Sequence, residues 1–150
     1  MLACSLAVHA YHNLPANMIS AASGTAPLQT MITQKTCTFA EGPAPHPTQG
    51  YLLYSCFRAA DGIRKVQAGA ETTFKADALT NGLVFDGSGK LFGVQRQGPS
   101  RVIEIDVATQ QVKPLTTQTF TSLNDLALDN VGGIYFTDYG GNTVYYRSAA

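Results

Sequence analysis

Four residues with oxygen-bearing side chains stand where an internal repeat of the chain begins. Glu41 opens the first copy, Asn81 opens the second, and Asn124 and Asp125 open the third. Carboxylate and amide oxygens are the ligands that a hard divalent cation prefers. A metal held by such oxygens can polarise a carbonyl group and acidify a water molecule. These residue types are therefore compatible with a metal site that assists hydrolysis, provided that the fold brings the three copies together.

The repeat predicts how the fold does this. Each copy contains alternating apolar residues, a glycine turn and a second apolar run, and the copies start at residues 41, 81 and 124. Short strands repeated at roughly 40 to 50 residues are typical of propeller blades. Each blade is a four-stranded antiparallel sheet that stacks on its neighbours around a channel. Equivalent positions then recur at one height, so we expect the four residues to cluster at one end of the inner strands.

Alternation with period two predicts the strands themselves. The expected ranges are Thr38–Ala44, Gly50–Phe57, Ile63–Ala68, Thr73–Lys75, Gly82–Phe85, Leu91–Gln95, Val102–Asp106, Lys113–Leu115, Leu126–Leu128, Ile134–Thr137 and Thr143–Tyr146. Met31–Phe39 also has the β-branched content of a strand, which would complete a last blade. The aspartates that follow strands are expected to serve turns, namely Asp86, Asp106, Asp129 and Asp138.

The class is therefore all-β, with an incomplete propeller over residues 36–150. Propellers have about four to eight blades, and this pattern accounts for about two and a half. Residues 1–35 are expected to be a tail or linker. Met1–Ala10 is apolar and ends in Val8-His9-Ala10, which resembles a cleavage site, so a clipped signal segment and a plain tail both stay open. A signal segment would favour a secreted or periplasmic location.

Composition excludes some partners and leaves the cysteines undecided. The chain has ten basic and ten acidic residues and no net charge, which argues against nucleic acid as a partner. The apolar N-terminal run is too short for a membrane span. The cysteines are Cys4, Cys37 and Cys56, an odd count that specifies no framework. Buried free thiols are the favoured state of Cys37 and Cys56, with a disulfide between them as the alternative.

Several segments resemble the SMP-30/gluconolactonase/luciferin-regenerating-enzyme family. They are Glu41-Gly42-Pro43, Gly50–Ser55, Asn81–Asp86, Ser122–Asp129 and Tyr135–Asp138. The resemblance covers roughly residues 36–146 and corresponds to the N-terminal half of the family. It implies a six-bladed propeller with one divalent cation, calcium or zinc, in its channel. It also implies hydrolysis of sugar lactones and other small lactones or esters.

The resemblance assigns roles to the four residues. Glu41 matches the family's first metal ligand, and Asp125 matches an acidic position that binds metal in some members. Asn124 matches an asparagine that contacts substrate or a metal-bound water, and Asn81 is also expected to contact substrate. No catalytic residue is expected in this chain, because the family's other ligand and its catalytic Asp come from later blades. We therefore expect negligible lactonase activity from residues 1–150 alone. Ser122 stands where many members carry arginine, which argues against a sugar-acid substrate.

Structural explanations of the same residues remain open. Glu41 before Gly-Pro can cap a turn, Asn81-Gly82 is a common turn pair, and Asn124-Asp125 can satisfy backbone groups at a strand entry. The competing function is a non-catalytic propeller that binds a ligand or a protein partner, because fold alone does not fix function.

The aromatic residues of the third copy predict a further property. Tyr135, Phe136, Tyr145 and Tyr146 are interpreted as packing between blades rather than as a substrate cage. An unclosed propeller leaves the face of its last blade bare. We therefore expect self-association through a surface that includes Tyr135, Tyr145 and Tyr146.

Overall fold

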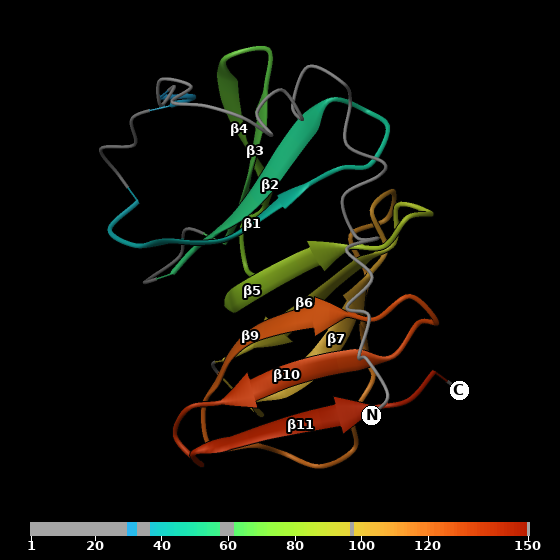
Figure 1. Ribbon diagram of the computed structural model, residues 1–150. Helices are drawn as coiled ribbons and strands as arrows, with labels where there is room; N and C mark the ends of the chain where they lie inside the picture. Colours follow the sequence, from blue (N-terminus) through green and yellow to red (C-terminus); the bar gives the residue numbers. More distant parts are fainter. Residues whose placement is uncertain (1–29, 33–36, 58–61, 97, 150) are drawn as a thin grey trace, which may run out of the picture.

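The molecule consists of three antiparallel sheets that follow one another along the chain (Figure 1). The computed structural model describes residues 30–32, 37–57, 62–96 and 98–149. The strand orders are β1-β2-β3-β4, then β5-β6-β7-β8, then β9-β10-β11. Every regular element in these ranges is a strand. The predicted all-β class and partial propeller are therefore confirmed.

All of the strands expected from the alternation pattern are present. Their bounds are β1 Ala40–Pro45, β2 Tyr51–Cys56, β3 Ile63–Gln67, β4 Ala70–Lys75, β5 Thr80–Phe85, β6 Leu91–Gln95, β7 Arg101–Ile105, β8 Val112–Pro114, β9 Leu123–Leu128, β10 Ile134–Asp138 and β11 Thr143–Arg147. The strands β5 and β9 begin earlier than predicted, at Thr80 and Leu123. Each contains a bulge near its start, and the extra residue interrupts the alternation from which the bounds were predicted.

The middle sheet is covered on both faces, and its alternation explains why. Successive residues Leu83 and Val84 of β5 point into different cores. On β7, Val102 and Ile103 divide in the same way. One core lies between the first and second sheets, and the other lies between the second and third. Figure 1 shows the first and third sheets at opposite ends of the molecule, with the second between them. Period-two alternation of apolar residues in a two-sided sheet produces this stacking.

The outward face of the third sheet carries exposed apolar side chains. Tyr135 is 48 % exposed, Tyr146 is 50 % exposed and Val144 is 69 % exposed. Tyr135 pairs with Tyr146 across β10 and β11, with ring centroids 4.7 Å apart. Tyr145 does not belong to this face, contrary to expectation. It alternates to the inner side, where its ring stacks on Phe136 at 5.4 Å.

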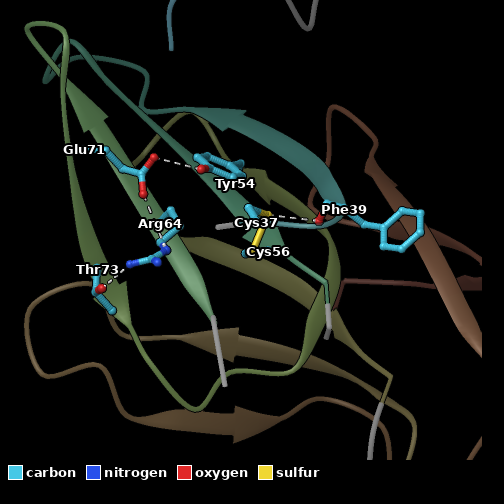
Figure 2. Close-up of polar contacts among 7 residues, drawn as sticks. All are labelled: Cys37, Phe39, Tyr54, Cys56, Arg64, Glu71 and Thr73. Carbon is cyan, nitrogen blue, oxygen red and sulfur yellow. Dashed lines mark hydrogen bonds and ion pairs between the residues drawn. A yellow bond between two sulfur atoms is a disulfide. The ribbon is translucent and has the colours of Figure 1, made fainter. Parts of the chain in front are cut away.

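Cys37 and Cys56 form a disulfide, so the preference for free thiols was wrong (Figure 2). Cys56 is the last residue of β2 and pairs with Ala40 at the start of β1. The segment before β1 therefore runs past the end of β2, and the two Cα atoms lie 5.5 Å apart, within the range of a disulfide. The register of β1 on β2 could not be predicted from the sequence.

The strand predicted over Met31–Phe39 is not observed in its described part. Residues 30–32 and 37–39 are irregular, and residues 33–36 lie outside the described ranges. The Phe39 carbonyl accepts a hydrogen bond from Phe57 N at 2.8 Å, but the ladder begins only at Ala40. A β-branched composition makes a strand only where a neighbouring edge offers a ladder.

The remainder of the predicted tail, residues 1–29 and 33–35, also lies outside the described ranges, and so does the possible signal segment. The part of the chain that the structure describes contains no helix long and apolar enough to cross a membrane.

The disulfide is expected to contribute measurably to stability. Its closed loop spans 19 residues in sequence, and a loop of this size corresponds to about 3 kcal/mol through the entropy of the unfolded chain. The double variant Cys37→Ser/Cys56→Ser should lose about that free energy of unfolding in urea titrations. Reductant should produce a similar loss in the natural chain and none in the variant. A natural chain insensitive to reductant would contradict the assignment.

The exposed face of the third sheet is expected to drive self-association. Val144→Lys places a charge on this face and should shift sedimentation towards monomer. Val131→Lys is the matched control, because Val131 is 71 % exposed but lies in the turn between β9 and β10. Equal sedimentation of the two variants and the natural chain would show that the face does not mediate association.

Candidate functional site

The inner strands of the three sheets, β1, β5 and β9, share one irregularity. Each gains one residue relative to its partner strand, which is the definition of a β-bulge. The bulges fall within residues 41–44, 80–83 and 123–126. All four candidate residues lie in these three segments. The repeat therefore conserves a bend in the backbone that the alternation pattern alone did not reveal.

Glycines let neighbouring inner strands meet at the bulges. Gly42 has a positive φ of 53°, and a Cβ there would lie 2.4 Å from the Asn81 carbonyl oxygen. A Cβ on Gly82 would lie 2.8 Å from Cα of Asp125. Such approaches exclude any side chain at these two positions. The first bulge thus packs on the second, and the second packs on the third.

This packing brings the candidate residues onto adjoining strands. Three of the candidates stand immediately before a residue that makes these close contacts. Glu41 precedes Gly42, Asn81 precedes Gly82, and Asn124 precedes Asp125. Glu41 and Asp125 are exposed, Asn124 is half-buried, and Asn81 is 2 % exposed. The structure places all four residues at the bulges of the inner strands. Their roles in binding metal and substrate remain predictions.

Asn81 has an unsatisfied polar group. Its Nδ2 atom is buried, and no hydrogen-bond acceptor for it lies in the described ranges. A buried amide without a partner costs free energy, so such groups in folded proteins are usually paired. The interpretation of Asn81-Gly82 as a turn pair does not account for this, because both residues lie within the strand β5.

Asp125 combines a local structural role with an accessible carboxylate. Its Oδ1 atom accepts a hydrogen bond from Leu126 N at 2.9 Å, and its own N–H donates to Thr137 Oγ1 at 3.1 Å. The side chain is exposed, which leaves its second carboxylate oxygen available to a ligand.

The donor set fits a hard cation better than a soft one. The bulges offer two carboxylates and two amide groups, all of which supply oxygen, the donor that calcium prefers. Zinc sites usually include histidine or cysteine. In the described ranges, Cys37 and Cys56 are consumed by the disulfide, and Nδ1 of His46 accepts hydrogen bonds from Thr48 N and Gln49 N. No cluster of three His, Cys, Asp or Glu side chains occurs there.

A hydroxyl pair was missed at the sequence level and joins the first two sheets beside the bulges. Ser55 Oγ and Thr80 Oγ1 lie 2.7 Å apart, and both residues are buried. Ser55 pairs with Glu41 across β1 and β2, and Thr80 precedes Asn81. Hydroxyl residues 25 positions apart give no pairing signal in a single sequence. This contact fixes the relative height of the first two bulges.

A second polar group joins β2, β3 and β4 of the first sheet (Figure 2). Tyr54 donates a hydrogen bond to Glu71 Oε2 at 3.0 Å, and Arg64 contacts both Glu71 and Thr73. Burial, followed by the hydrogen bond and charge of Glu71, raises the pKa of Tyr54 to about 12. Because the phenol and both charged groups have partners, this cluster serves the packing of β2, β3 and β4.

The predicted turn role is confirmed for Asp86, Asp106 and Asp129. Asp138 is the most buried of the four, and besides its own turn it holds the segment that leads into β9. Its carboxylate accepts hydrogen bonds from Ser122 N at 2.7 Å, Thr121 N at 2.9 Å and Gly141 N at 3.2 Å. Burial opposes its ionisation, but the backbone N–H groups outweigh burial and lower the pKa of Asp138 from 3.8. Asp86, Asp106 and Asp129 likewise accept hydrogen bonds from backbone N–H groups in their turns.

Asp138 is expected to give the chain a specific loss of stability in acid. Its depressed pKa contributes stability above pH 4, and this is lost as pH falls through the folded-state pKa. Asp138→Asn should lower the melting temperature at pH 7, and the deficit in melting temperature should narrow as the pH falls below 4. Glu104→Gln is the control, because the Glu104 carboxylate has no hydrogen bond or ion pair in the described ranges. A deficit independent of pH would contradict the assignment.

Comparison with known proteins supports the fold. No family model matches the chain, and no curated protein matches it in sequence. Among solved structures, a gluconolactonase from Xanthomonas campestris superposes with a TM-score of 0.61 at 28 % identity, over 68 % of this chain and 35 % of that one. A protein proposed to be a gluconolactonase superposes with a TM-score of 0.59 at 19 % identity, over 69 % and 37 %.

A chain of the nidogen/laminin complex is also similar. It superposes with a TM-score of 0.62 at 15 % identity, over 71 % of this chain and 43 % of that chain, a likeness of fold alone. The chain therefore spans between a third and a half of the length of the structures that it matches. Its fold is that of a gluconolactonase-like propeller.

Proposed function

We propose that this chain contributes the first part of a metal-dependent hydrolase of small lactones or esters. The observation that carries the proposal is the packing of three bulges, which puts Glu41, Asn81, Asn124 and Asp125 on adjoining inner strands. The 28 % identity to a gluconolactonase supports the same class of reaction. Because the chain covers about a third of that protein, activity is proposed for a protein that contains this chain.

The proposal divides the four residues by their chemistry. Glu41 and Asp125 would hold a divalent cation, preferably calcium, through carboxylate oxygens. The cation would polarise the lactone carbonyl and acidify water when bound. Asn124 and Asn81 would orient the lactone, because an amide can donate to a carbonyl and accept from a hydroxyl. The unpaired Nδ2 of Asn81 gives such a donor without breaking an existing bond.

No residue of the chain is assigned as the general base. Asp138 is the most buried carboxylate in the described ranges, but its oxygens already accept three backbone hydrogen bonds. Its lowered pKa also makes it a weak proton acceptor at neutral pH. We therefore propose that the base comes from outside these 150 residues, and that calcium bound here alone takes most of its ligands from water.

Metal titration and lactone hydrolysis test this division of roles. The 150-residue chain should bind calcium weakly by calorimetry, and Glu41→Gln should weaken that binding further. Its hydrolysis of gluconolactone should stay at the background rate. A longer protein containing the chain should hydrolyse the lactone, lose activity in chelator, and lose it again with Glu41→Gln. Chelator-sensitive turnover by the short chain would contradict the absence of a base.

The matched control for Glu41→Gln is Glu104→Gln, a substitution of the same chemistry on β7 and outside the bulges. It should leave both calcium binding and hydrolysis unchanged. Equal losses in the two variants would mean that the effect is general electrostatics and not coordination at Glu41.

A non-catalytic binding propeller is the second candidate. The observation that favours it is the lack of three clustered His, Cys, Asp or Glu side chains in the described ranges. In that case Asn81 and Asn124 would contact a ligand without any requirement for metal. Lactone or sugar binding that persists in chelator, in a longer protein without turnover, would favour this candidate over the hydrolase.

A further inference from the structure

Arg96 joins all three sheets just beyond the end of β6. Its backbone N–H donates to the Leu79 carbonyl at 3.0 Å, at the entry to β5. Its guanidinium carbon lies 4.3 Å from the ring centroid of Phe57, beyond the end of β2, and 5.2 Å from that of Tyr139, beyond the end of β10. Stacking of a guanidinium on aromatic rings is favourable and holds its plane in one orientation.

Two hydrogen bonds fix the guanidinium further. Nε of Arg96 donates to Ser122 Oγ at 3.2 Å, and Nη2 donates to Tyr139 Oη at 2.9 Å. A guanidinium has five N–H donors, so three of them have no acceptor among the described residues. The two rings and the two hydrogen bonds together hold the guanidinium in one orientation. Its other three N–H donors are available to a ligand.

Among the described residues, Arg96 also has no ion-pair partner. The ion pairs in the described ranges are Arg64 with Glu71 and Lys75 with Asp77. Asp138 is adjacent to Tyr139 in sequence, but no ion pair joins its carboxylate to Arg96. A half-buried, preorganised cation without an anionic partner is the arrangement that a protein uses to bind an anion.

The guanidinium lies at the same end of the inner strands as the candidate site. Leu79 and Ser122, which bond Arg96, each stand two residues before a candidate, Asn81 and Asn124 respectively. At about 3.3 Å per residue along a strand, this separation is about 7 Å. One small ligand can therefore extend from the guanidinium towards Asn124, which is half-buried, whereas Asn81 is buried.

We propose that Arg96 and Tyr139 form a recognition site for the carboxylate of a small organic acid. The identification of that acid as a hydroxy acid, or as a lactone bearing its own carboxylate, rests on the proposed function. A planar carboxylate matches the fork of the free guanidinium donors, and Tyr139, which accepts from Arg96, keeps its own O–H to donate. Ser122, whose identity argued against a sugar acid, instead orients an arginine that comes from the second sheet.

Titration with sugar probes tests the assignment without any catalysis. The natural 150-residue chain is titrated in chelator with gluconate, with glucose 6-phosphate and with glucose, by chemical-shift changes. Gluconate should bind, and high salt should weaken its binding. Glucose should not bind, because it lacks the anion. Arg96→Gln should weaken gluconate binding about tenfold or more, as expected for loss of charge-assisted hydrogen bonds. Arg96→Lys keeps the charge but loses the planar guanidinium fork. Its affinity for gluconate should lie between those of the natural chain and Arg96→Gln.

Arg101→Gln is the matched control. Arg101 starts β7, and its guanidinium donates to Gln95 Oε1 at 3.0 Å rather than to Ser122 or Tyr139. This variant should bind gluconate as the natural chain does. All titrations are made well below the melting temperature of each variant, which is measured separately. A purely structural role of Arg96 would lower the melting temperature and leave gluconate affinity unchanged, and that result would overturn the proposal.

Three other results would also overturn it: no gluconate binding by the natural chain, equal binding of glucose, or tighter binding of glucose 6-phosphate than of gluconate. These outcomes are separable from those of the proposed hydrolase. Gluconate binding without lactone turnover in a longer protein would leave the carboxylate site standing and reject the hydrolase. Lactone turnover in a longer protein, together with gluconate binding that does not depend on Arg96, would support the hydrolase and reject the carboxylate site.

Discussion

The close approach of the inner strands at their bulges is the constraint on which the rest of the structure depends. Gly42 lies against the backbone of Asn81, and Gly82 lies against Asp125, at distances that no Cβ can tolerate. These contacts set the spacing between sheets where they converge. Apolar side chains fill the two cores between the sheets. A larger residue at either glycine would separate both the cores and the candidate residues.

The polar contacts around the bulges then fix the height of one sheet relative to the next. The Ser55 and Thr80 hydroxyls join the first sheet to the second, and Arg96 joins the second to the other two. Buried polar groups with complete hydrogen bonding specify one arrangement, whereas apolar packing alone tolerates sliding. The unpaired amide of Asn81 stands out against this background. The unpaired amide lowers the stability of the fold at the place where a ligand is proposed to bind.

The third sheet illustrates how the same pattern has two outcomes. On β10 and β11 the side chains alternate as strictly as on the middle sheet, so that Tyr145 packs inward while Tyr146 is exposed. In the middle sheet, the corresponding outward residues are covered by the next sheet along the chain. Burial in a propeller is therefore a property of neighbouring sheets and not of one strand. Tyr145 and Tyr146 must point to opposite faces because they are adjacent on β11, but only the stacking of the sheets decides which face is covered.

The sequence by itself determined the strands, the turns and the class of fold. Alternation and glycine turns act between near neighbours, so each strand from β1 to β11 was predicted from its own residues. Tertiary structure decided the remainder, because it depends on pairing between distant segments. The register of β1 on β2 made the Cys37–Cys56 disulfide, and the bulges extended β5 and β9 to include Asn81 and Asn124. Only the stacking of three sheets placed Arg96 beside Ser122 and Tyr139, since these residues are 26 and 43 positions apart in the chain.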